Sequence, residues 1–265
     1  MLKLYHGYLS VCAQKARLGL AEKGLAWESQ LVDLQKGEQQ TLEYLKLNPR
    51  GVIPTLVHDD RVVRESNVII EYLDEVFAAP PLKSDDPYER AQMRIWMKRL
   101  DEGHHDVATA VMSQAISIRH RYLAMGVEEA TKRVEGQVDP IKRERRRSVM
   151  FEGVESPEFA TAINMWRKLF DDMEAGLDAA GFLAGSVYSL ADLAWTPYFV
   201  RLEQLTFDRL MDNYPNITEW FGKMKSRPSY PVAIEGWSSK SHVENNLKHG
   251  AEAWDRVKEL FDAAA

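Results

Sequence analysis

The chain has little cysteine, no long apolar run and no excess of basic charge. Each of these absences excludes a class of protein. A single cysteine, Cys12, excludes an intrachain disulfide and is typical of a protein of the reducing cytoplasm. No run of about 18 apolar residues occurs, and Met1-Leu2-Lys3 opens directly into a predicted strand, so we expect neither a membrane span nor a signal peptide. The net charge of −6 gives no general attraction to nucleic acid or to an anionic membrane.

The composition predicts a globular protein of two domains. Hydrophobic content of 45% and charged content of 28% are ordinary, and 265 residues suffice for two modest domains. Strand and helix patterns fill residues 1–77, and residues 78–87, rich in proline and aspartate, are typical of a linker. Residues 88–265 show only helical spacing, which includes a long stretch over Tyr88–Arg119 and a weakly amphipathic one over His249–Ala264. The latter segment either closes over a site or pads the surface.

In residues 1–77 the pattern predicts the order β-α-β-α-β-β-α. The first β-α-β occupies about thirty residues, the minimum for a right-handed parallel crossover. The predicted strands are Leu2–Tyr5, Trp27–Leu34, a strand that begins at Pro54, and Arg61–Val63, and the predicted helices are Cys12–Lys23, Thr41–Leu47 and Val68–Val76.

The stretch Gly51–Val57, followed by Glu65-Ser66, predicts a ligand site. Pro54 cannot donate to a sheet ladder, so we expect it at the start of a strand, after a sharp bend. The bend leaves the backbone N–H and C=O of Ile53 free to pair with an extended peptide. The helix that begins at Glu65-Ser66 presents unpaired N–H groups and a positive dipole end, which favour a carboxylate. Together these features predict a pocket for a small acidic peptide.

The run from Leu2 to Phe77 resembles the thioredoxin-like, glutathione-binding domain of the glutathione S-transferase superfamily. The resemblance implies an α/β thioredoxin-like N-terminal domain, an all-α C-terminal domain and glutathione as co-substrate. It also implies a homodimer, in which the first domain of one subunit pairs with the helical domain of the other.

The same resemblance assigns the residues that hold glutathione. It implies that Pro54 is cis and that Glu65-Ser66 holds the γ-glutamyl carboxylate, with Val52 and Ile53 beside the peptide. Gln39 matches the region that holds the glycine carboxylate better than Gln40 does. In this superfamily the residue at that position is often basic, so an amide implies weaker binding of the glycine carboxylate.

Three residues around the entrance to the first helix are candidates for catalysis. Glutathione carries its own thiol, so the protein needs only to favour the thiolate, which a donor near a helix N-terminus does. Tyr8, Ser10 and Cys12 lie in or next to this loop, and Ser10 fits a donor to the thiolate. Cys12 is either a nucleophile that forms a mixed disulfide, which another glutathione must resolve, or a buried small hydrophobe. The sequence leaves these alternatives open.

Within the superfamily the resemblance divides between two groups. Tyr8–Lys15 looks like the Ser-x-Cys segment of zeta-type transferases, which include hydroquinone dehalogenases, and Tyr188–Leu205 also resembles the dehalogenases. Residues 48–51, 62–77 and 86–102 look more like the bacterial stereospecific β-etherases, in which Asn matches Cys12 and Ser matches Ala13. In both groups glutathione thiolate attacks an electrophilic carbon and expels an aryloxide or a halide.

Three functions therefore remain. The first is a glutathione transferase acting on an aromatic electrophile, with β-aryl ether cleavage ahead of dehalogenation. The second is a Cys12-dependent thiol transferase or glutathione-conjugate lyase, and the third is a non-catalytic protein that binds hydrophobic ligands or partners. We expect the second substrate to be small and hydrophobic, and to rest on a face of the helical domain carrying Trp96, Met97, His104, His105, Tyr122 and Trp195.

Three further patterns have structural interpretations. His104 and His105 are adjacent on a helix and point about 100° apart, so we predict no metal site there. The basic run 142–147 is interpreted as a solvated helix face. Ser189 and Asp192 form a capping box, in which Ser189 accepts from the N–H of Asp192 and the carboxylate returns to the N–H of Ser189. The resemblance implies that this box is buried and serves folding.

Overall fold

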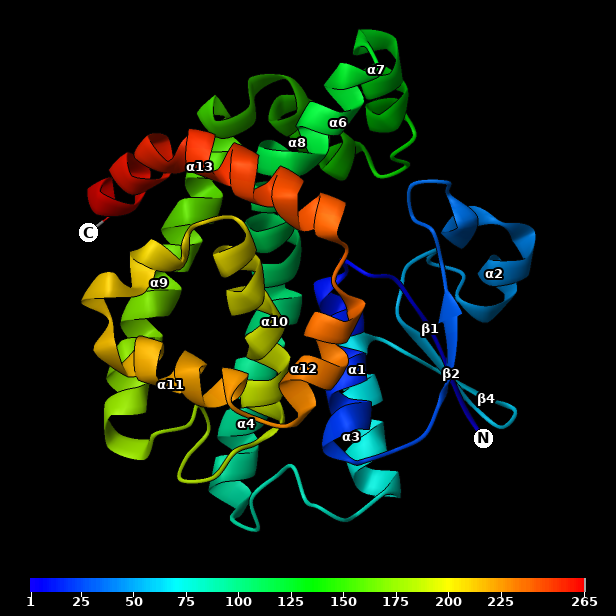
Figure 1. The fold of residues 1–265 in the computed structure, drawn as a ribbon, viewed down its shortest axis with the longest axis vertical. Coiled ribbons are helices and arrows are strands. Elements are labelled where there is room, and N and C mark those ends of the chain that lie inside the picture. Colours follow the sequence, from blue (N-terminus) through cyan, green and yellow to red (C-terminus); the bar gives the residue numbers. More distant parts are fainter. Residues whose placement is uncertain (265) are drawn as a thin grey trace. The chain divides into compact units, whose positions relative to one another are not determined.

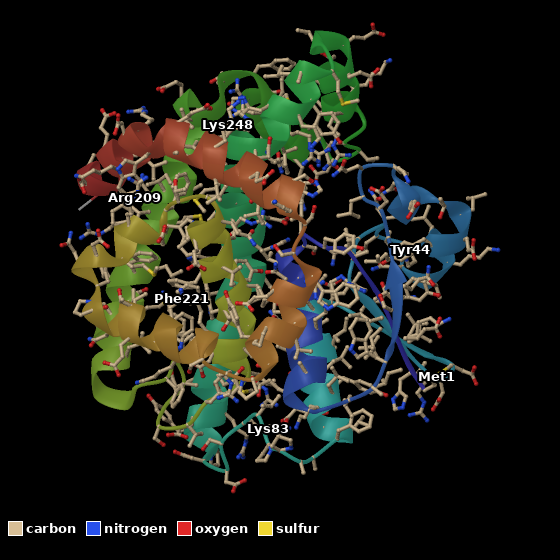
Figure 2. All side chains as sticks on the ribbon, viewed as in Figure 1. Met1, Tyr44, Lys83, Arg209, Phe221 and Lys248 are labelled. Atoms are coloured by element: carbon tan, nitrogen blue, oxygen red, sulfur yellow. The ribbon has the colours of Figure 1, made fainter. Side chains whose placement is uncertain are left out.

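The computed structural model describes residues 1–264, with all side chains except those of 178–180 (Figures 1 and 2). The last residue of the predicted domain 88–265 lies outside the described residues. The chain forms two compact units, each built from segments that are distant in sequence. The first unit comprises Met1–Met97, Ala180–Tyr198 and Trp220–Lys240, and the second comprises Lys98–Ala179, Phe199–Glu219 and Ser241–Ala265.

A four-stranded sheet lies at the centre of the first unit. The strand order is β2-β1-β3-β4, with β1 parallel to β2 and antiparallel to β3. The predicted order β-α-β-α-β-β-α is confirmed, although the second strand is shorter than Trp27–Leu34. The strands are β1 (Leu2–His6), β2 (Glu28–Leu31), β3 (Thr55–His58) and β4 (Arg61–Arg64), and the helices among them are α1 (Val11–Glu22), the 3-10 helix Glu38–Gln40, α2 (Leu42–Leu47) and α3 (Ser66–Val76).

Alternating side chains of β1 divide the core of this unit between the two faces of the sheet. Leu4 packs in one cluster with Leu20 of α1 and Leu73 of α3. Tyr5 points to the opposite face, where its ring centroid lies 5.9 Å from that of Tyr44 in α2. Figure 1 accordingly shows α1 and α3 on one side of the sheet and α2 on the other. Because side chains of a strand alternate with a period of two, Leu2 and Leu4 lie on the buried face, while Lys3 and Tyr5 lie on the other face and are only half-buried.

Beyond the predicted linker the described chain is helical, as predicted. No helix among the described residues carries an apolar stretch long enough to cross a membrane. The helices are α4 (Pro87–Arg99), α5 (Ala110–Ser113), α6 (Arg119–Ala124), α7 (Val127–Glu135), α8 (Pro140–Glu152), α9 (Pro157–Ala180), α10 (Leu190–Gln204), α11 (Pro215–Lys225), α12 (Ser229–Ala233) and α13 (Lys240–Ala263), with 3-10 turns at Gly153–Glu155, Asp208–Asn213 and Glu235–Trp237.

The stretch Tyr88–Arg119 is less regular than its spacing predicts. After α4 the chain continues in wide, π-helical turns at Leu100–Thr109 and Gln114–Ile118. Gly103 interrupts the first of them with φ of 138°, a backbone conformation that favours glycine. A helical hydrophobic period does not distinguish α from π turns, so this irregularity could not be predicted from the spacing.

Phe170 of α9 is the centre of an aromatic core in the second unit. Its ring centroid lies 5.7 Å from that of Phe199, 5.0 Å from that of Tyr214 and 5.6 Å from that of Phe261. Such pairs add about 0.5–1.5 kcal/mol each to the burial of the rings. Phe261 belongs to α13, so the C-terminal helix is part of the core of this unit rather than surface padding.

Gly250 brings α13 into backbone contact with the segment after α10. A Cβ atom at position 250 would lie 2.0 Å from the carbonyl oxygen of Leu205. Only a residue without a side chain allows this approach. The N-terminal half of α13 is therefore placed by backbone contact, and its C-terminal half by Phe261.

Asp192 is fully buried in the first unit and accepts four hydrogen bonds. Oδ2 accepts from the N–H of Ser189 (2.9 Å) and from its hydroxyl (3.1 Å). Oδ1 accepts from the N–H of Leu183 (2.9 Å) and the indole N–H of Trp220 (2.9 Å). Burial raises the pKa of this carboxyl, and the hydrogen bonds oppose the shift. The return bond to the N–H of Ser189 is confirmed, but the Ser189 hydroxyl accepts from Ala191 (3.3 Å) rather than from Asp192.

Glu22, at the end of α1, joins two later segments of the first unit. Arg227 donates two hydrogen bonds to its carboxylate, both 2.7 Å long. The hydroxyls of Ser229 (2.6 Å) and Tyr188 (3.2 Å) also donate to it. Burial disfavours the charged form, but these bonds and the Arg227 charge outweigh it and hold the pKa of Glu22 below its usual value. The first unit is thus tied together by polar contacts that reach residue 229.

We expect Asp192→Ala to lower the free energy of unfolding by about 3 kcal/mol or more. The change leaves three buried N–H donors without an acceptor, those of Leu183, Ser189 and Trp220. Each buried donor that lacks an acceptor costs about 1–3 kcal/mol of stability. Urea unfolding followed by tryptophan fluorescence measures the loss. Asp212→Ala, at an exposed position, is the control and should stay within about 0.5 kcal/mol of wild type. A loss below about 1 kcal/mol for Asp192→Ala would contradict this role.

Candidate functional site

Three segments predicted to form a ligand site meet at one end of the strands β1, β3 and β4 in the first unit. Tyr5 of β1 pairs with Thr55 of β3, and Thr55 pairs with Arg64 of β4. These three residues form one row across the sheet, and each is next to a segment that the sequence marks as a site. The segments are residues 7–12, which comprise the loop after β1 and the start of α1, residues 52–54 before β3, and residues 65–66 after β4.

The loop after β1 is held from two sides. A Cβ at Gly7 would lie 2.9 Å from Cδ1 of Ile53, so the loop packs directly against the turn before β3. Buried Arg17 donates from Nη1 to the carbonyl oxygen of Gly7 (3.1 Å) and from Nε to that of Ala233 (2.8 Å). Burial lowers the pKa of Arg17 to about 9, so the guanidinium remains charged at neutral pH. Sequence reasoning missed this residue.

Ser10 and Cys12 lie at the N-terminus of α1, as predicted. Ser10 is the N-cap, and its Oγ accepts from the N–H of Ala13 (3.2 Å). A hydroxyl that accepts this bond still has its own O–H to donate to another acceptor. Cys12 is the second residue of the helix, half-buried and outside any disulfide. Both residues therefore lie where the helix dipole favours a negative charge.

Tyr8 lies in the same loop, next to an aromatic group that sequence reasoning missed. The Tyr8 side chain is 44% exposed, and its ring centroid is 6.2 Å from that of Trp237. Trp237 also contacts His6 (4.7 Å between centroids) and lies 5.5 Å from the Arg17 guanidinium. Burial and the charge of Arg17 lower the pKa of His6 to about 4, so this ring is neutral. Trp237 follows no periodic pattern, and its position in the sequence therefore carried no signal.

The turn before β3 is held by a closed network of buried side chains. The Ile53–Pro54 peptide is cis, as the resemblance implied. The carbonyl oxygen of Val52 accepts from the hydroxyl of Tyr44 (2.8 Å) and the amide of Asn48 (2.8 Å). The hydroxyl of Thr55 lies 3.0 Å from that of Tyr44 and accepts from Asn48 (3.2 Å). The hydrogen bonds of the described chain leave the backbone N–H and C=O of Ile53 unused.

The start of α3 combines backbone strain with N–H groups that have no acceptor within the helix. Glu65 is its N-cap and has φ of 64° and ψ of 119°, an unusual conformation for a residue with a side chain that costs about 1–3 kcal/mol. Its carboxylate pairs with Arg50 (2.5 Å). Ser66 is the first helical residue and is 8% exposed. The first turn of α3 thus offers N–H groups and a hydroxyl to a carboxylate.

Gln39 and Gln40 differ in the use of their side chains. The amide of Gln40 donates to the carbonyl oxygen of Gly51 (3.3 Å), so it supports the turn before β3. The Oε1 atom of Gln39 is buried and has no hydrogen-bond partner among the described residues. Gln39 therefore keeps an unused acceptor beside this turn, whereas a carboxylate would accept from the N–H₂ group of the same amide.

The helical residues predicted to face a second substrate are partly core residues. Trp195 is fully buried and donates its indole N–H to the carbonyl oxygen of Trp96 (3.1 Å). Trp96 and Met97 are buried as well. The prediction that Trp195 lines an open substrate face is therefore wrong. The other members of the predicted face, which are half-buried in the second unit, are His104, His105 and Tyr122.

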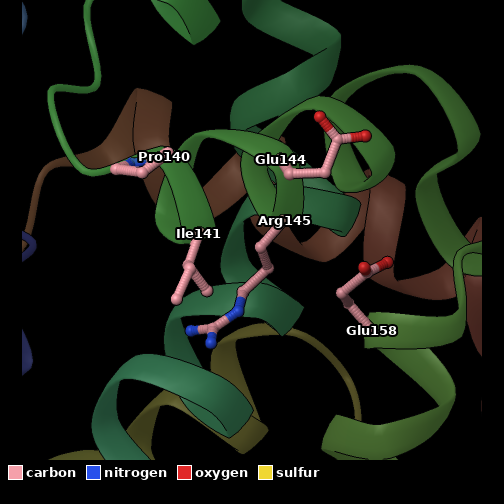
Figure 3. Close-up of a pocket in the computed structure, with 5 residues that line it drawn as sticks. All are labelled: Pro140, Ile141, Glu144, Arg145 and Glu158. Atoms are coloured by element: carbon pink, nitrogen blue, oxygen red, sulfur yellow. The ribbon is translucent and has the colours of Figure 1, made fainter.

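An open pocket of about 520 Å³ lies in the second unit, along α8 and the start of α9. In Figure 3, Arg145 and Ile141 point the same way, whereas Glu144 points away from them. Glu158 accepts a hydrogen bond from the hydroxyl of Ser148 (2.5 Å). Two carboxylates accompany one guanidinium here, so the pocket does not offer the convergent donors that an acidic peptide needs.

The basic run 142–147 is engaged in ion pairs on the surface of the second unit. Lys142 pairs with Asp106 (2.7 Å), and Arg143 (3.8 Å) and Arg147 both pair with Glu135. Each of these side chains is at least one-third exposed, as predicted for a solvated helix face. Arg146 departs from the prediction, because it is half-buried and donates to the carbonyl oxygen of Arg133 (3.3 Å).

Comparisons with known proteins agree in pointing to one family. Residues 9–76 match the family model of the glutathione S-transferase N-terminal domain, and residues 127–223 match that of the glutathione S-transferase C-terminal domain. The domain boundaries 1–77, 78–87 and 88–265 themselves stay predictions.

Two curated relatives match along nearly their whole length. The chain is 31% identical over 262 residues to Protein LigF of Sphingobium sp. (strain NBRC 103272 / SYK-6), covering 95% of this chain and 98% of LigF. It is 27% identical over 246 residues to the tetrachloro-p-hydroquinone reductive dehalogenase of Sphingobium chlorophenolicum, covering 88% and 95%. The crystal structure of the beta-etherase LigF matches with a TM-score of 0.74 at 29% identity, covering 89% of this chain and 99% of LigF.

We expect Thr55→Val to lower the free energy of unfolding by about 1–3 kcal/mol, because it leaves the buried amide of Asn48 without one of its acceptors. The substitution keeps the size of the side chain, so the effect reports the hydroxyl. Chemical denaturation measures it, with Thr161→Val, at an exposed helical position, as the matched control. Equal stability of the two variants would show that the network does not hold the turn.

Proposed function

This chain belongs to the glutathione S-transferase superfamily, and from that premise we propose that it is a glutathione transferase acting on a small aromatic electrophile. The co-substrate is glutathione, as it is in the homologues. Its thiolate displaces an aryloxide or a halide from carbon. The cytoplasm, where one cysteine and no disulfide are typical, is the proposed location.

The observation that carries this proposal is the row of paired residues Tyr5, Thr55 and Arg64, which brings the three segments together at one end of the strands. In our assignment the unused backbone groups of Ile53 pair with the peptide backbone of glutathione, beside Val52 and Pro54. The γ-glutamyl carboxylate lies at the start of α3, where Ser66 receives it at the positive end of the helix dipole and Glu65 sets the backbone turn. The amide of Gln39 binds the glycine carboxylate.

Ser10 is the proposed donor to the thiolate. Its O–H remains available because Oγ accepts, rather than donates, in the capping bond to Ala13. The thiolate attacks the carbon that bears the leaving group, a C–S bond forms, and the C–O or C–halogen bond breaks with its electron pair. Solvent protonates a released aryloxide. One well-placed donor of this kind is worth about 10²–10³ in rate.

Ether cleavage is the favoured reaction, with dehalogenation second. The match to the relative named as a beta-etherase covers 98% of that protein at 31% identity, whereas the dehalogenase is 27% identical. By the resemblance, this chain differs from the β-etherases at the start of α1, because Asn and Ser of those enzymes match Cys12 and Ala13 here. The aromatic pair Tyr8 and Trp237, beside the loop that carries Ser10, supports an aromatic second substrate.

A second candidate function follows from the position of Cys12. It lies half-buried in the first turn of α1, where a thiolate is favoured. As a thiol transferase, Cys12 would attack the sulfur of a glutathione conjugate, and the C–S electron pair would leave on carbon and take a proton. The mixed disulfide would then be reduced by a second glutathione, which releases glutathione disulfide.

A substrate panel separates these candidates. It comprises a β-aryl ether ketone, a chlorinated hydroquinone and a mixed glutathione disulfide, each tested on wild type, Ser10→Ala and Cys12→Ser. We expect Ser10→Ala to lower kcat/KM for the ether by about 10²–10³, and Cys12→Ser to spare it, because only Ser10 stabilises the attacking thiolate. Ser226→Ala, at an exposed serine, is the control.

Three results of this experiment contradict the proposal. Loss of all activities in Cys12→Ser, with Ser10→Ala unchanged, would establish the Cys12 mechanism instead. Glutathione uptake in calorimetry without turnover of any substrate would indicate a non-catalytic binding protein. Absence of glutathione uptake would refute the site itself.

We also propose a homodimer, as the resemblance implies. Val68 on α3 and Ile95 on α4 are both 53% exposed, and the two helices are linked by Arg94 and Glu71 (2.7 Å). Apolar side chains this exposed are suited to burial against a second copy. We expect sedimentation equilibrium to give twice the chain mass, and the double variant Val68→Asp/Ile95→Asp to give the mass of a single chain. A wild-type monomer would contradict the proposal.

A further inference from the structure

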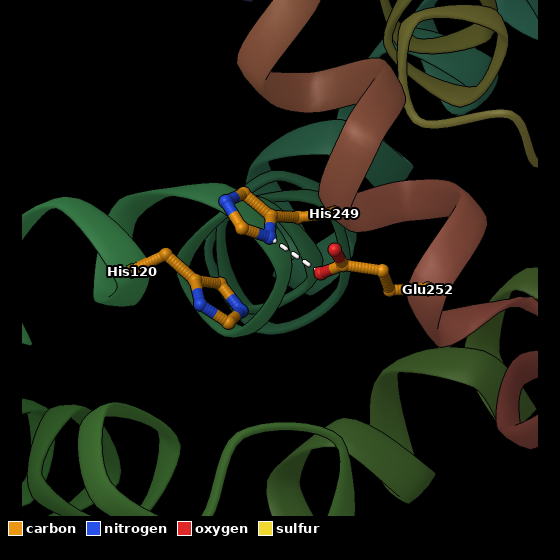
Figure 4. Close-up of side chains that lie close together, drawn as sticks. All are labelled: His120, His249 and Glu252. Carbon is orange, nitrogen blue, oxygen red and sulfur yellow. Dashed lines mark hydrogen bonds and ion pairs between the residues drawn. The ribbon is translucent and has the colours of Figure 1, made fainter.

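Two histidines and a carboxylate lie together in the second unit. His120 belongs to α6, and His249 and Glu252 belong to α13. Each offers one donor atom, and the three atoms lie within 4.8 Å of one another. His249 Nδ1 is 2.7 Å from a carboxylate oxygen of Glu252. Figure 4 marks this contact with a dashed line. None of these residues belongs to the site proposed for glutathione.

We propose that His120, His249 and Glu252 bind a divalent transition cation of the Zn²⁺ type. Imidazole nitrogen and carboxylate oxygen are ligands that zinc prefers, and three protein ligands leave a fourth position for water. Ligand atoms 2.0–2.2 Å from a tetrahedral ion lie about 3.3 Å from one another. Donors already within 4.8 Å therefore need to close by no more than about 1.5 Å.

The histidine rings need one simple adjustment to bind an ion. They are stacked, with centroids 3.8 Å apart and planes 1° from parallel, so their in-plane lone pairs do not converge. Rotation of the His120 ring about its Cβ–Cγ bond turns one nitrogen toward the gap between His249 and Glu252. That torsion is broad and soft in histidine. The stack brings two imidazole rings together without a group that they both bind, and a cation would supply it.

The backbone that carries the ligands is fixed without the ion. His249 and Glu252 are three residues apart on α13 and hence share one face of the helix. The contact of Gly250 with Leu205 holds α13 at this point. On α6, Arg119 donates to the carbonyl oxygen of Met150 (3.1 Å) and so anchors the residue before His120. A site whose supports are already in place loses little entropy when it binds.

Burial and charge limit the strength of the site. The side chain of His249 is 13% exposed and that of Glu252 is 54% exposed, so one side of the site is open to water. Arg119 and Lys248 are nearby cations, which weaken the binding of another. We therefore expect micromolar affinity. A bound ion would fasten the N-terminal half of α13 to α6 in the second unit.

Zinc titration of the full-length, chelator-treated protein tests this proposal. We expect one Zn²⁺ per chain in calorimetry, and affinity at least tenfold lower in His120→Ala and in His249→Ala. Glu252→Gln should weaken binding as well. His105→Ala is the matched control, because His105 is half-buried in the same unit and lies 3.9 Å from a carboxylate of Asp106. Its affinity should equal that of wild type.

Two further measurements distinguish this site from binding at Cys12 and from a folding defect of the variants. Co²⁺ bound in place of Zn²⁺ should show visible bands without a thiolate charge-transfer band, because Cys12 is not a ligand. Hydrogen exchange in residues 240–252 should slow with Zn²⁺ in wild type and not in His249→Ala, and the metal-free variants should unfold cooperatively as wild type does. No saturable uptake, a thiolate band, or wild-type affinity in both histidine variants would overturn the proposal.

Discussion

The register of β1 against β3 is the constraint on which the candidate site depends. Leu4 pairs with Leu56, and both are fully buried. A slip by one residue would turn the side chains of one of the two strands to the other face of the sheet, and Leu4 or Leu56 would leave the buried cluster in which both pack, at a cost of about 1.5–3 kcal/mol. The same register places Tyr5 opposite Thr55. Hydrophobic burial on one face thus determines which loops meet at the end of the strands, and the polar site inherits its geometry from an apolar contact.

Much of this arrangement could be predicted because its signals are local. The Gly51–Val57 stretch carries its own proline, turn and apolar run, and the start of α3 follows within ten residues. The element order and the cis bond before Pro54 were therefore predictable, the latter by resemblance. The supports of the site were not, since Arg17 reaches Ala233, and Trp237 reaches Tyr8, across most of the chain. Pairings between distant residues leave no periodic trace in a single sequence.

The helical segments show the same division between local and distant information. Asp192 caps its own helix as the sequence predicts, yet two of its four hydrogen bonds come from Leu183 and Trp220, outside the capping box. The spacing of Tyr88–Arg119 predicts a helix but not its π-helical turns. The histidines of α6 and α13 carry no signal in the sequence and become neighbours only because α13 packs through Gly250 and Phe261.

The interleaved composition of the two units has a consequence for synthesis of the chain. Glu22 needs Arg227 and Ser229, and the first unit ends only at Lys240, although its sheet is complete at Arg64. A ribosome adds about 5–20 residues per second. The segments that complete the first unit are therefore synthesised on the order of ten seconds after its sheet. During that interval α1 lacks α12, which packs against it in the complete unit. Chaperones that bind nascent chains can therefore act on this protein during that interval, which ends when α12 leaves the exit tunnel.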